Sequence, residues 1–263
     1  MTKIITSSQN KKIKGLKTLW TVKGRKKEGK FLVEGPVVLQ EVLPYQKPLE
    51  LYIGEEEGPK YQNLIRDVRL LNIPITYVKS DLLKSVLPTE EPQGIVGIFS
   101  KIKVEEIIPQ KGPILYLDGI RDPGNLGGIF RSANAFGVTK IYLSKDCVDI
   151  YNPKVIRSTM ASLFRVPFEI IHGYKDLDKI MKSGYIGIGL DIEGSENFDF
   201  QGNEKILFVV GNEHHGISQE LKGYLDKKIR IPMEREVESL NVNVATSICL
   251  YEYYKRKLRR SYE

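Results

Sequence analysis

The stretch DGIRDPGNLGGIFRSANAFG, residues 118–137, most constrains how this chain can fold. It follows an apolar run at 114–117 that predicts a buried strand, and the apolar residues behind it recur at helical spacing: Leu126, Ile129, Phe130, Ala133 and Phe136. A polar turn between a buried strand and an amphipathic helix is typical of a parallel α/β sheet. Such sheets bind ligands at the carboxyl ends of their strands, so residues 118–125 are expected to border a binding site.

Three kinds of residue mark the start of this predicted helix. Asn125 is expected to cap it, because its side-chain oxygen can accept from a free N–H group of the first turn. Arg131 lies on the flank of the helix, away from the apolar stripe, and one turn after Gly127 and Gly128. The missing side chains of the two glycines are expected to leave room for another molecule beside the guanidinium.

Strands and helices alternate through the second half of the chain. The pattern predicts six strands, at 114–117, 140–143, 166–170, 186–190, 206–210 and 228–231. Helices are predicted at 126–136, 153–162, 175–183 and 217–225, followed by a long last helix at 241–259. This alternation predicts a parallel sheet covered by helices on both faces.

The first hundred residues repeat the alternation in shorter elements. Helices are predicted at 8–20, 36–43, 60–70 and 81–86, and strands at 31–33, 49–53, 75–78 and 95–99. The charged segment 101–112 contains a proline and a glycine and precedes a new strand, so we place a domain boundary there. We expect a smaller α/β domain over 1–105 and a larger one over 112–263.

Positive charge is concentrated at the N-terminus. The formal net charge is +7, but the first 30 residues hold ten lysines or arginines and one glutamate, so the remainder is slightly acidic. A basic block of this kind indicates a polyanionic partner, usually nucleic acid. The alternative is a solvated basic tail. The recurrence of Ile13, Leu16, Leu19 and Trp20 as one face of a helix argues against this alternative.

Two further unusual loops follow predicted strands. The strand at 206–210 runs into GNEHHG, where Gly211 would let a ligand approach the backbone and Glu213 would place a carboxylate near a helix start. The strand at 228–231 ends at Pro232, which has no N–H to donate, and SLNVNVA then opens the last helix. Each loop is a weak signal when it is taken alone.

Together the three loops resemble the signature motifs of the SPOUT superfamily, specifically of its TrmH-type RNA 2′-O-ribose methyltransferases. The matching motifs are NxGGxxR in the first loop, GNExxG in the second, and IPM followed by SLNVxVA in the third. The resemblance covers residues 112–260. It implies a parallel-sheet domain with a C-terminal trefoil knot, S-adenosylmethionine as methyl donor, and a homodimer formed through the C-terminal domain.

The basic N-terminal part, with FLVEG at 31–35, is similar in a looser way to the RNA substrate-binding domain of many family members. That domain is a small α/β fold related to a ribosomal protein. Because of it, the resemblance favours ribosomal RNA as the substrate, with transfer RNA as the alternative.

Carried over position by position, the resemblance implies two sets of site residues. The cofactor is expected on the loops at Gly211, Ile231 and Leu240, with Leu190 and Met233 as neighbours. The polar, catalytic set is Arg131, Asn125, Glu213, Ser239 and Asn241.

The family assigns Arg131 to activating the ribose hydroxyl. A guanidinium, with a pKa above about 12, is a poor base, so we expect Arg131 to grip the adjacent phosphate and stabilise developing alkoxide. Asn125, Ser239 and Asn241 would orient the ribose, and Glu213 would position Arg131 or Asn125. The alternatives are local: Glu213 as an anion at a helix start, and Ser239 as the cap of the last helix.

Other features indicate no further chemistry. His214 and His215 are adjacent, so they cannot share one metal as an i, i+4 pair can, and no metal site is expected. Cys147 and Cys249 are read as small buried hydrophobes. The pair Gly187-x-Gly189 resembles the start of a dinucleotide fingerprint, but Ile192 stands where the third glycine belongs, which argues against a nucleotide-binding oxidoreductase.

The expected protein is a cytoplasmic RNA 2′-O-methyltransferase. No apolar run reaches the roughly 18 residues of a membrane span, and the N-terminus has no signal-peptide core. The rival from another class is a non-catalytic RNA-binding protein with the same fold. The presence of the whole polar set at the motif positions argues against that rival.

Overall fold

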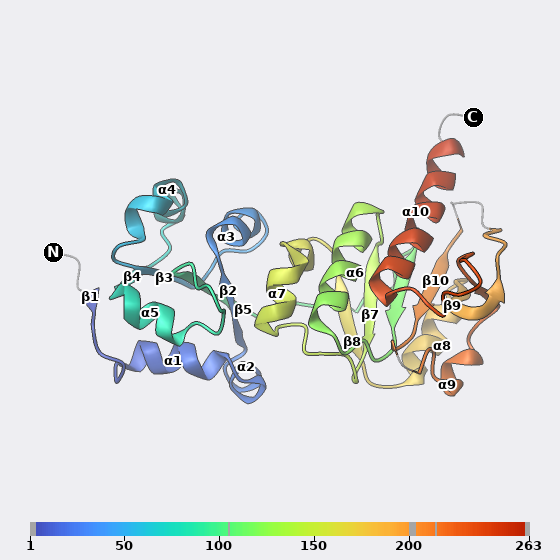
Figure 1. Cartoon of the computed structure of the whole chain (residues 1–263), viewed down its shortest axis with the longest axis horizontal. Coiled ribbons are helices and arrows are strands. Elements are labelled where there is room, and N and C mark those ends of the chain that lie inside the picture. The colour runs from blue at the N-terminus through green and yellow to red at the C-terminus, as the bar shows by residue number, and fades with distance from the viewer. Residues whose placement is uncertain (1–3, 105, 200–203, 214, 261–263) are drawn as a thin grey trace. The chain divides into compact units, whose positions relative to one another are not determined.

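The computed structural model describes residues 4–104, 106–199, 204–213 and 215–260, and the chain forms two compact units (Figure 1). The first unit comprises Met1–Lys103 together with Asp149–Phe164, and the second comprises Val104–Val148 and Arg165–Glu263. A segment from the middle of the chain therefore belongs to the N-terminal unit.

The first unit is built on a five-stranded sheet of order β1-β4-β3-β5-β2. The strands are β1 (Ile4–Ile5), β2 (Lys30–Glu34), β3 (Glu50–Gly54), β4 (Ile75–Val78) and β5 (Ile95–Ser100). β4 runs parallel to β1 and β3, whereas β5 is antiparallel to β3 and β2. The helices are α1 (Lys11–Leu19), α2 (Val22–Glu28), α3 (Pro36–Val42), α4 (Gln62–Leu70), α5 (Ser80–Val86) and α7 (Pro153–Thr159), with short 3-10 turns η1 (Gly58–Tyr61) and η2 (Ser162–Phe164).

The basic N-terminal block folds into two helices instead of the one predicted at 8–20. Asn10 caps α1 by accepting from the Lys12 N–H, and Thr21 caps α2 by accepting from the Gly24 N–H. The apolar stripe of α1 is buried against residues of β2, β3 and α5. The alternative of a solvated tail is therefore wrong for residues 11–28.

Arg25 of α2 is buried although it belongs to the basic block. Its guanidinium donates to the Asp149 carboxylate at 2.6 Å and to the carbonyl oxygens of Leu19 and Trp20 at 3.0 and 2.8 Å. The next residues of the same segment are also held here, because the Tyr151 ring packs 4.7 Å from Phe31. Arg25 thus fastens Asp149–Phe164 to the first unit and is not available to a partner.

The second unit has a six-stranded sheet of order β11-β9-β10-β6-β7-β8, and all neighbouring strands in its described part pair in parallel, as predicted. The strands are β6 (Ile114–Leu117), β7 (Lys140–Ser144), β8 (Phe168–Ile171), β9 (Ile186–Ser195), β10 (Ile206–Val210) and β11 (Lys227–Ile229). The helices are α6 (Pro123–Ala135), α8 (Tyr174–Lys182), α9 (Gln219–Lys222) and α10 (Val242–Arg260).

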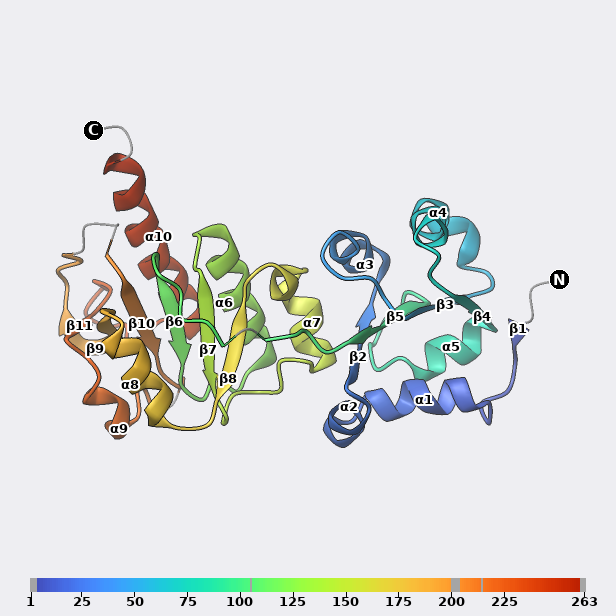
Figure 2. The same cartoon turned by 180° about the vertical axis from the view of Figure 1, so that it is seen from behind.

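Helices cover both faces of this sheet, with α6 and α10 on one face and α8 on the other (Figures 1 and 2). Alternate residues of the central strands serve the two faces. Leu207 and Val209 of β10 pack in a cluster with Leu177 and Ile180 of α8. Phe208 between them meets Tyr253 of α10, with ring centroids 5.9 Å apart. β10 is buried along its whole length, as a central parallel strand should be.

Helices α6 and α10 lie side by side and run in the same direction. Successive contacts join Asn125 to Asn241, Ser132 to Ser247 and Phe136 to Tyr251, so the residue numbers rise together along both helices. The two helix N-termini consequently meet at the carboxyl edge of the sheet. This places two positive helix-dipole ends at one point.

The two glycines of β9 that resemble a dinucleotide fingerprint lie against other parts of the chain. A Cβ at Gly187 would lie 2.1 Å from the Tyr224 carbonyl oxygen, and one at Gly189 would lie 2.6 Å from the Leu225 side chain. Both positions are therefore filled by the segment that follows α9. Among the residues that the structure describes, no helix is long and apolar enough to cross a bilayer.

We predict that Arg25→Ala lowers the free energy of unfolding by about 3 kcal/mol, because it leaves the Asp149 carboxylate and two helix-end carbonyls without their donor. Urea titration followed by circular dichroism measures the loss. Lys26→Ala is the matched control, since Lys26 is the exposed neighbour on the same helix and should change stability by less than about 0.5 kcal/mol. Equal effects of the two substitutions would contradict the role of Arg25.

Candidate functional site

Three loops emerge at the carboxyl edge of the second sheet. Residues 118–122 follow β6, residues 211–218 follow β10, and residues 230–241 join β11 to α10. Because β6, β9 and β10 are adjacent and parallel, their carboxyl ends open toward the same space. This is the edge at which parallel α/β sheets bind ligands.

The loop after β10 is a tight turn closed by backbone hydrogen bonds. Asn212 and Gly216 exchange N–H to carbonyl bonds of 3.0 and 2.9 Å, and Gly216 has a φ of +65°. A Cβ at Gly211 would lie 2.1 Å from the carbonyl carbon of Gly216 and 2.3 Å from its oxygen. Glycine is required at position 211 because the returning backbone occupies the space of a side chain.

The first two loops are joined by polar contacts. The Asn212 side chain donates to the Gly119 carbonyl oxygen at 2.7 Å, and the Asp118 carboxylate accepts from the Ser218 N–H at 2.9 Å. These bonds satisfy backbone groups that the strand ends leave free. They also fix the distance between the ends of β6 and β10.

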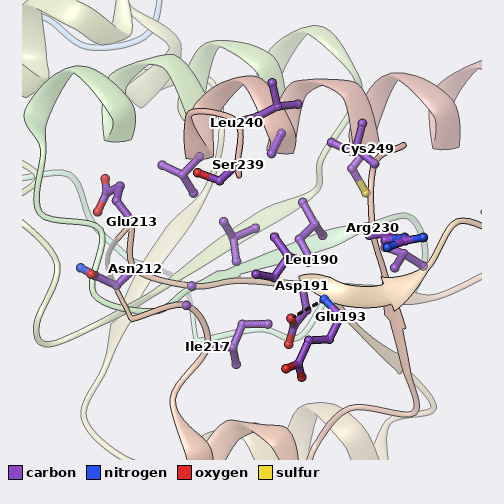
Figure 3. A pocket seen from close by; sticks show the side chains of 18 of the residues that line it. Leu190, Asp191, Glu193, Asn212, Glu213, Ile217, Arg230, Ser239, Leu240 and Cys249 are labelled. Atoms are coloured by element: carbon purple, nitrogen blue, oxygen red, sulfur yellow. Dashed lines mark hydrogen bonds between the residues drawn. The ribbon is translucent and has the colours of Figure 1, made fainter. Parts of the chain in front are cut away.

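A cavity of about 660 Å³ lies between the loops (Figure 3). All five residues predicted to contact the cofactor line it: Leu190, Gly211, Ile231, Met233 and Leu240. Glu213, Ser239 and Asn241 of the predicted polar set also line it. The volume lies within the range of small-molecule and cofactor sites, about 300–1,000 Å³.

Two lining residues of opposite character were not predicted from the sequence as part of the site. Burial opposes ionisation of Asp191, but the Glu193 N–H and the Lys228 ammonium, whose nitrogen is 3.3 Å away, hold the pKa of this carboxyl below its usual range. The cavity wall formed by the middle of β9 therefore carries an ionised carboxylate paired with Lys228. On α10, burial raises the pKa of the Cys249 thiol, so it stays protonated and acts as an apolar surface.

Asn125 joins the three loops through its side-chain amide. Its nitrogen donates to the Glu213 carboxylate at 2.7 Å, and its oxygen accepts from the Asn241 side chain at 2.8 Å. Of the two partners expected for Glu213, the structure places Asn125 against its carboxylate. The three residues form a continuous chain of hydrogen bonds along the rim of the cavity.

The cap of α6 differs from the predicted one, and the alternative of Ser239 as the cap of α10 is wrong. Asp122 caps α6 by accepting from the Asn125 N–H at 2.7 Å, so Asn125 is the third residue of the helix and its side chain is free for the rim. Asn241, not Ser239, caps α10, because its side-chain oxygen accepts from the Asn243 N–H at 3.0 Å. Ser239 lies in the loop before the helix and faces the cavity.

The glycine face beside Arg131 is closed, contrary to the prediction. Gly127 is buried, and a Cβ at Gly128 would lie 2.3 Å from Nδ2 and 2.6 Å from Oδ1 of Asn243. The missing side chain at Gly128 thus admits α10 of the same chain and leaves no space for a second molecule at that point. The loss of side chains serves helix packing.

Arg131 itself is exposed. Within the described part of the chain, its guanidinium has no hydrogen-bond or ion-pair partner. Arg131 does not line the cavity and lies six residues after Asn125 on α6. A free guanidinium can bind a phosphate or another oxyanion with two parallel hydrogen bonds.

The described residues contain no candidate metal site. None of their Asp, Glu, His or Cys side chains form a group of three or more that could hold a metal ion. His215 lines the cavity, and His214 lies outside the described residues. The sequence did not indicate Asp191 or Cys249 as site residues because neither belongs to a motif, although it did predict Cys249 as a small buried hydrophobe. Only the adjacency of Asp191 to Leu190 at a strand end could have indicated it.

Two protein families match the chain. The SpoU rRNA methylase family matches residues 112–251, and the MRM3-like substrate binding domain matches residues 10–97. The first match contains the cavity and the polar rim, and the second contains the basic helices.

Individual proteins match over nearly the whole chain. An uncharacterised tRNA/rRNA methyltransferase of Synechocystis sp. is 31% identical over 258 residues, which cover 94% of this chain and 92% of that protein. The 23S rRNA (guanosine(2553)-2′-O)-methyltransferase RlmP of Bacillus subtilis is 29% identical and covers 95% and 98%.

An AdoMet-bound rRNA methyltransferase of Sinorhizobium meliloti has the same fold, with a TM-score of 0.85, 27% identity and coverage of 97% of this chain and 98% of that one. The SPOUT resemblance of the three motifs is thereby confirmed. With its parallel-sheet unit, its cavity and its family match over more than half of its length, this chain belongs to the SpoU rRNA methylase family.

Proposed function

We propose that this protein transfers a methyl group from S-adenosylmethionine to a ribose 2′-hydroxyl of ribosomal RNA. One observation carries the proposal: the cavity that holds all five expected cofactor residues shares its rim with the chain Asn241, Asn125, Glu213. Relatives named as 23S rRNA 2′-O-methyltransferases support ribosomal RNA over transfer RNA.

The cavity fits the proposed methyl donor by its chemistry. Leu190, Ile231 and Leu240 supply apolar walls for an adenine, and the carboxylate of Asp191 suits a ligand that carries positive charge or hydroxyl groups. S-adenosylmethionine, when bound, supplies a methyl group on a positively charged sulfur. The protein must then align the ribose 2′-oxygen with the methyl carbon, allow the proton of the 2′-hydroxyl to leave, and exclude water.

We assign the polar residues to the ribose side of this reaction. Arg131 binds the phosphate next to the reacting ribose and stabilises negative charge as it develops on the 2′-oxygen. The hydroxyl proton leaves toward that phosphate, because a guanidinium is already fully protonated. Asn125 and Asn241 are held in place by each other and by Glu213, and Ser239 faces the ribose from the opposite loop.

Several finer expectations stay proposals. We propose a trefoil knot in the C-terminal part of the second unit and a first unit related to a ribosomal protein. The family matches support domains at 1–105 and 112–263, except that Asp149–Phe164 packs with the first unit. A homodimer through the second unit is supported by apolar side chains exposed on α10, namely Val244, Tyr251 and Leu258. A cytoplasmic location is supported by the proposed ribosomal RNA substrate.

We predict that Arg131→Ala abolishes methyl incorporation into RNA but leaves cofactor binding unchanged. Loss of the guanidinium removes the charge that stabilises the developing alkoxide, so the turnover rate should fall on the order of a thousandfold. The measurements are transfer of radioactive methyl to ribosomal RNA from cells that lack this protein and calorimetric titration with S-adenosylmethionine. Unimpaired turnover would contradict the assigned role of Arg131.

We predict that Gly211→Ala weakens S-adenosylmethionine binding by on the order of tenfold or more. The added methyl group meets the Gly216 backbone, so the whole turn must move away from its place on the cavity wall. Isothermal calorimetry measures the change. Gly15→Ala is the control, because a Cβ there has no atom within 4 Å, and it should bind the cofactor like the unsubstituted protein.

Neutralising Lys11, Lys14, Lys26 and Lys27 together should weaken RNA binding and flatten its dependence on salt. These four are exposed, whereas Lys12 is engaged by Glu50 and Thr76. Fewer released counterions should reduce the slope of log K against log salt by up to about 3. Filter binding at several salt concentrations measures this slope.

The control for this block carries neutral residues at Lys47, Lys60 and Lys79, which are exposed on the same unit outside the two basic helices. It should keep a steeper slope than the first variant. A slope that is the same in both variants would show that the basic helices do not contact RNA.

A further inference from the structure

Asn243 lies in the first turn of α10 and is not among the residues assigned to the site above. Its side-chain amide lies flat against Gly128 of α6, with all three of its terminal atoms within 2.6 Å of the position a Cβ would take there. The side-chain oxygen Oδ1 is closed to solvent and accepts no hydrogen bond. A buried acceptor without a donor is costly, so native proteins seldom leave one unless another state supplies the partner.

The neighbouring polar groups on these helices already have partners. The Asn125 and Asn241 side chains bind each other, and the Ser247 hydroxyl bonds the Ser132 hydroxyl and the Asn243 carbonyl oxygen. None of them is directed at Asn243 Oδ1. A side chain without a partner of its own is therefore the first candidate for the missing donor.

Arg131 meets this requirement. It lies three residues after Gly128 on the same helix, and a helical side chain points back over the preceding turn, which brings the Arg131 stem alongside Gly128 and the amide on it. The guanidinium carries several N–H donors and has no partner among the described residues. Within the described ranges, Asn243 Oδ1 is thus an acceptor without a donor, and the Arg131 guanidinium is a donor without an acceptor. Both residues lie beside Gly128.

We infer that Asn243 is a positioning residue for Arg131: when RNA binds, its amide rotates and Oδ1 accepts from the guanidinium, which fixes the plane in which Arg131 meets the phosphate. This inference rests on the proposed function. In the structure the guanidinium is exposed to solvent, and the Asn243 amide lies against Gly128. The absence of a side chain at Gly128 is what lets the amide lie there.

The test compares Asn243→Ala, Asn243→Asp and Ser247→Ala in methyl transfer to ribosomal RNA from cells that lack this protein. Asn243→Ala should lower kcat on the order of tenfold, with KM for S-adenosylmethionine within about twofold of its original value. Asn243→Asp keeps an acceptor oxygen and should restore most of kcat. Ser247→Ala removes a bond between the same helices one turn farther on, and it should leave kcat unchanged.

A second measurement separates positioning from packing. In nitrogen-15 spectra, the Arg131 Nε–H signal, assigned by its absence in Arg131→Lys, should become protected from exchange when a ribosomal RNA hairpin is added. Protection should occur in the unsubstituted protein and in Asn243→Asp, and should be absent in Asn243→Ala. This signal reports the hydrogen bond even if a variant has lost activity for another reason.

The outcomes distinguish the two proposals. An unsubstituted protein that transfers no methyl group to RNA contradicts the proposed function. A fully active protein in which Asn243→Ala and Ser247→Ala lower kcat equally, or in which Arg131 is protected without Asn243, overturns the inference and leaves the proposed function standing.

Discussion

The side chain of Asn125 is the interaction on which the site depends. Its two hydrogen bonds reach Glu213, 88 residues away in sequence, and Asn241, 116 residues away. Because an amide presents one donor end and one acceptor end, the chain of bonds has a single direction and each partner can be replaced only by a group of the same polarity. Three loops that fold from distant parts of the chain are thereby kept in register around one cavity.

The parallel direction of α6 and α10 explains why a carboxylate, that of Glu213, lies at their N-termini. Two parallel helices bring two positive dipole ends together, which by itself is unfavourable, and the Glu213 carboxylate lies where it offsets them. Close approach of the helices needs small side chains at the contact, and Gly128, Ser132 and Ser247 provide them. Packing and electrostatics therefore act on the same few residues, and Arg131 is exposed on α6 farther along the helix.

The resemblance of the three motifs to a known family supplied eight residues that line the cavity, but not Asp191 or Cys249. Periodicity and motifs predicted the six strands of the second sheet and the edge that carries the site, because these follow from local apolar patterns and from loops at strand ends. They did not predict which residue caps each helix. Asp122 and Asn125 are equally good caps by composition, and the choice depends on Glu213 and Asn241, which are remote in sequence. The prediction that Gly128 leaves room for another molecule was wrong for the same reason. The residue that fills this space, Asn243, comes from another helix and is remote in sequence. The split between α1 and α2 was missed because Thr21 caps the second helix only two residues after the first ends.

The first unit is discontinuous in sequence, and this limits how the protein can be divided. A polypeptide that began near residue 112 would contain the whole methylase family match, yet it would carry Asp149–Phe164 without the groups that cover it. Tyr151 and Phe164 would lose the ring of Phe31, and Asp149 would lose Arg25. Gain or loss of the substrate-binding domain, in the laboratory or during evolution, therefore requires a compensating change in a segment that lies within the catalytic half of the sequence.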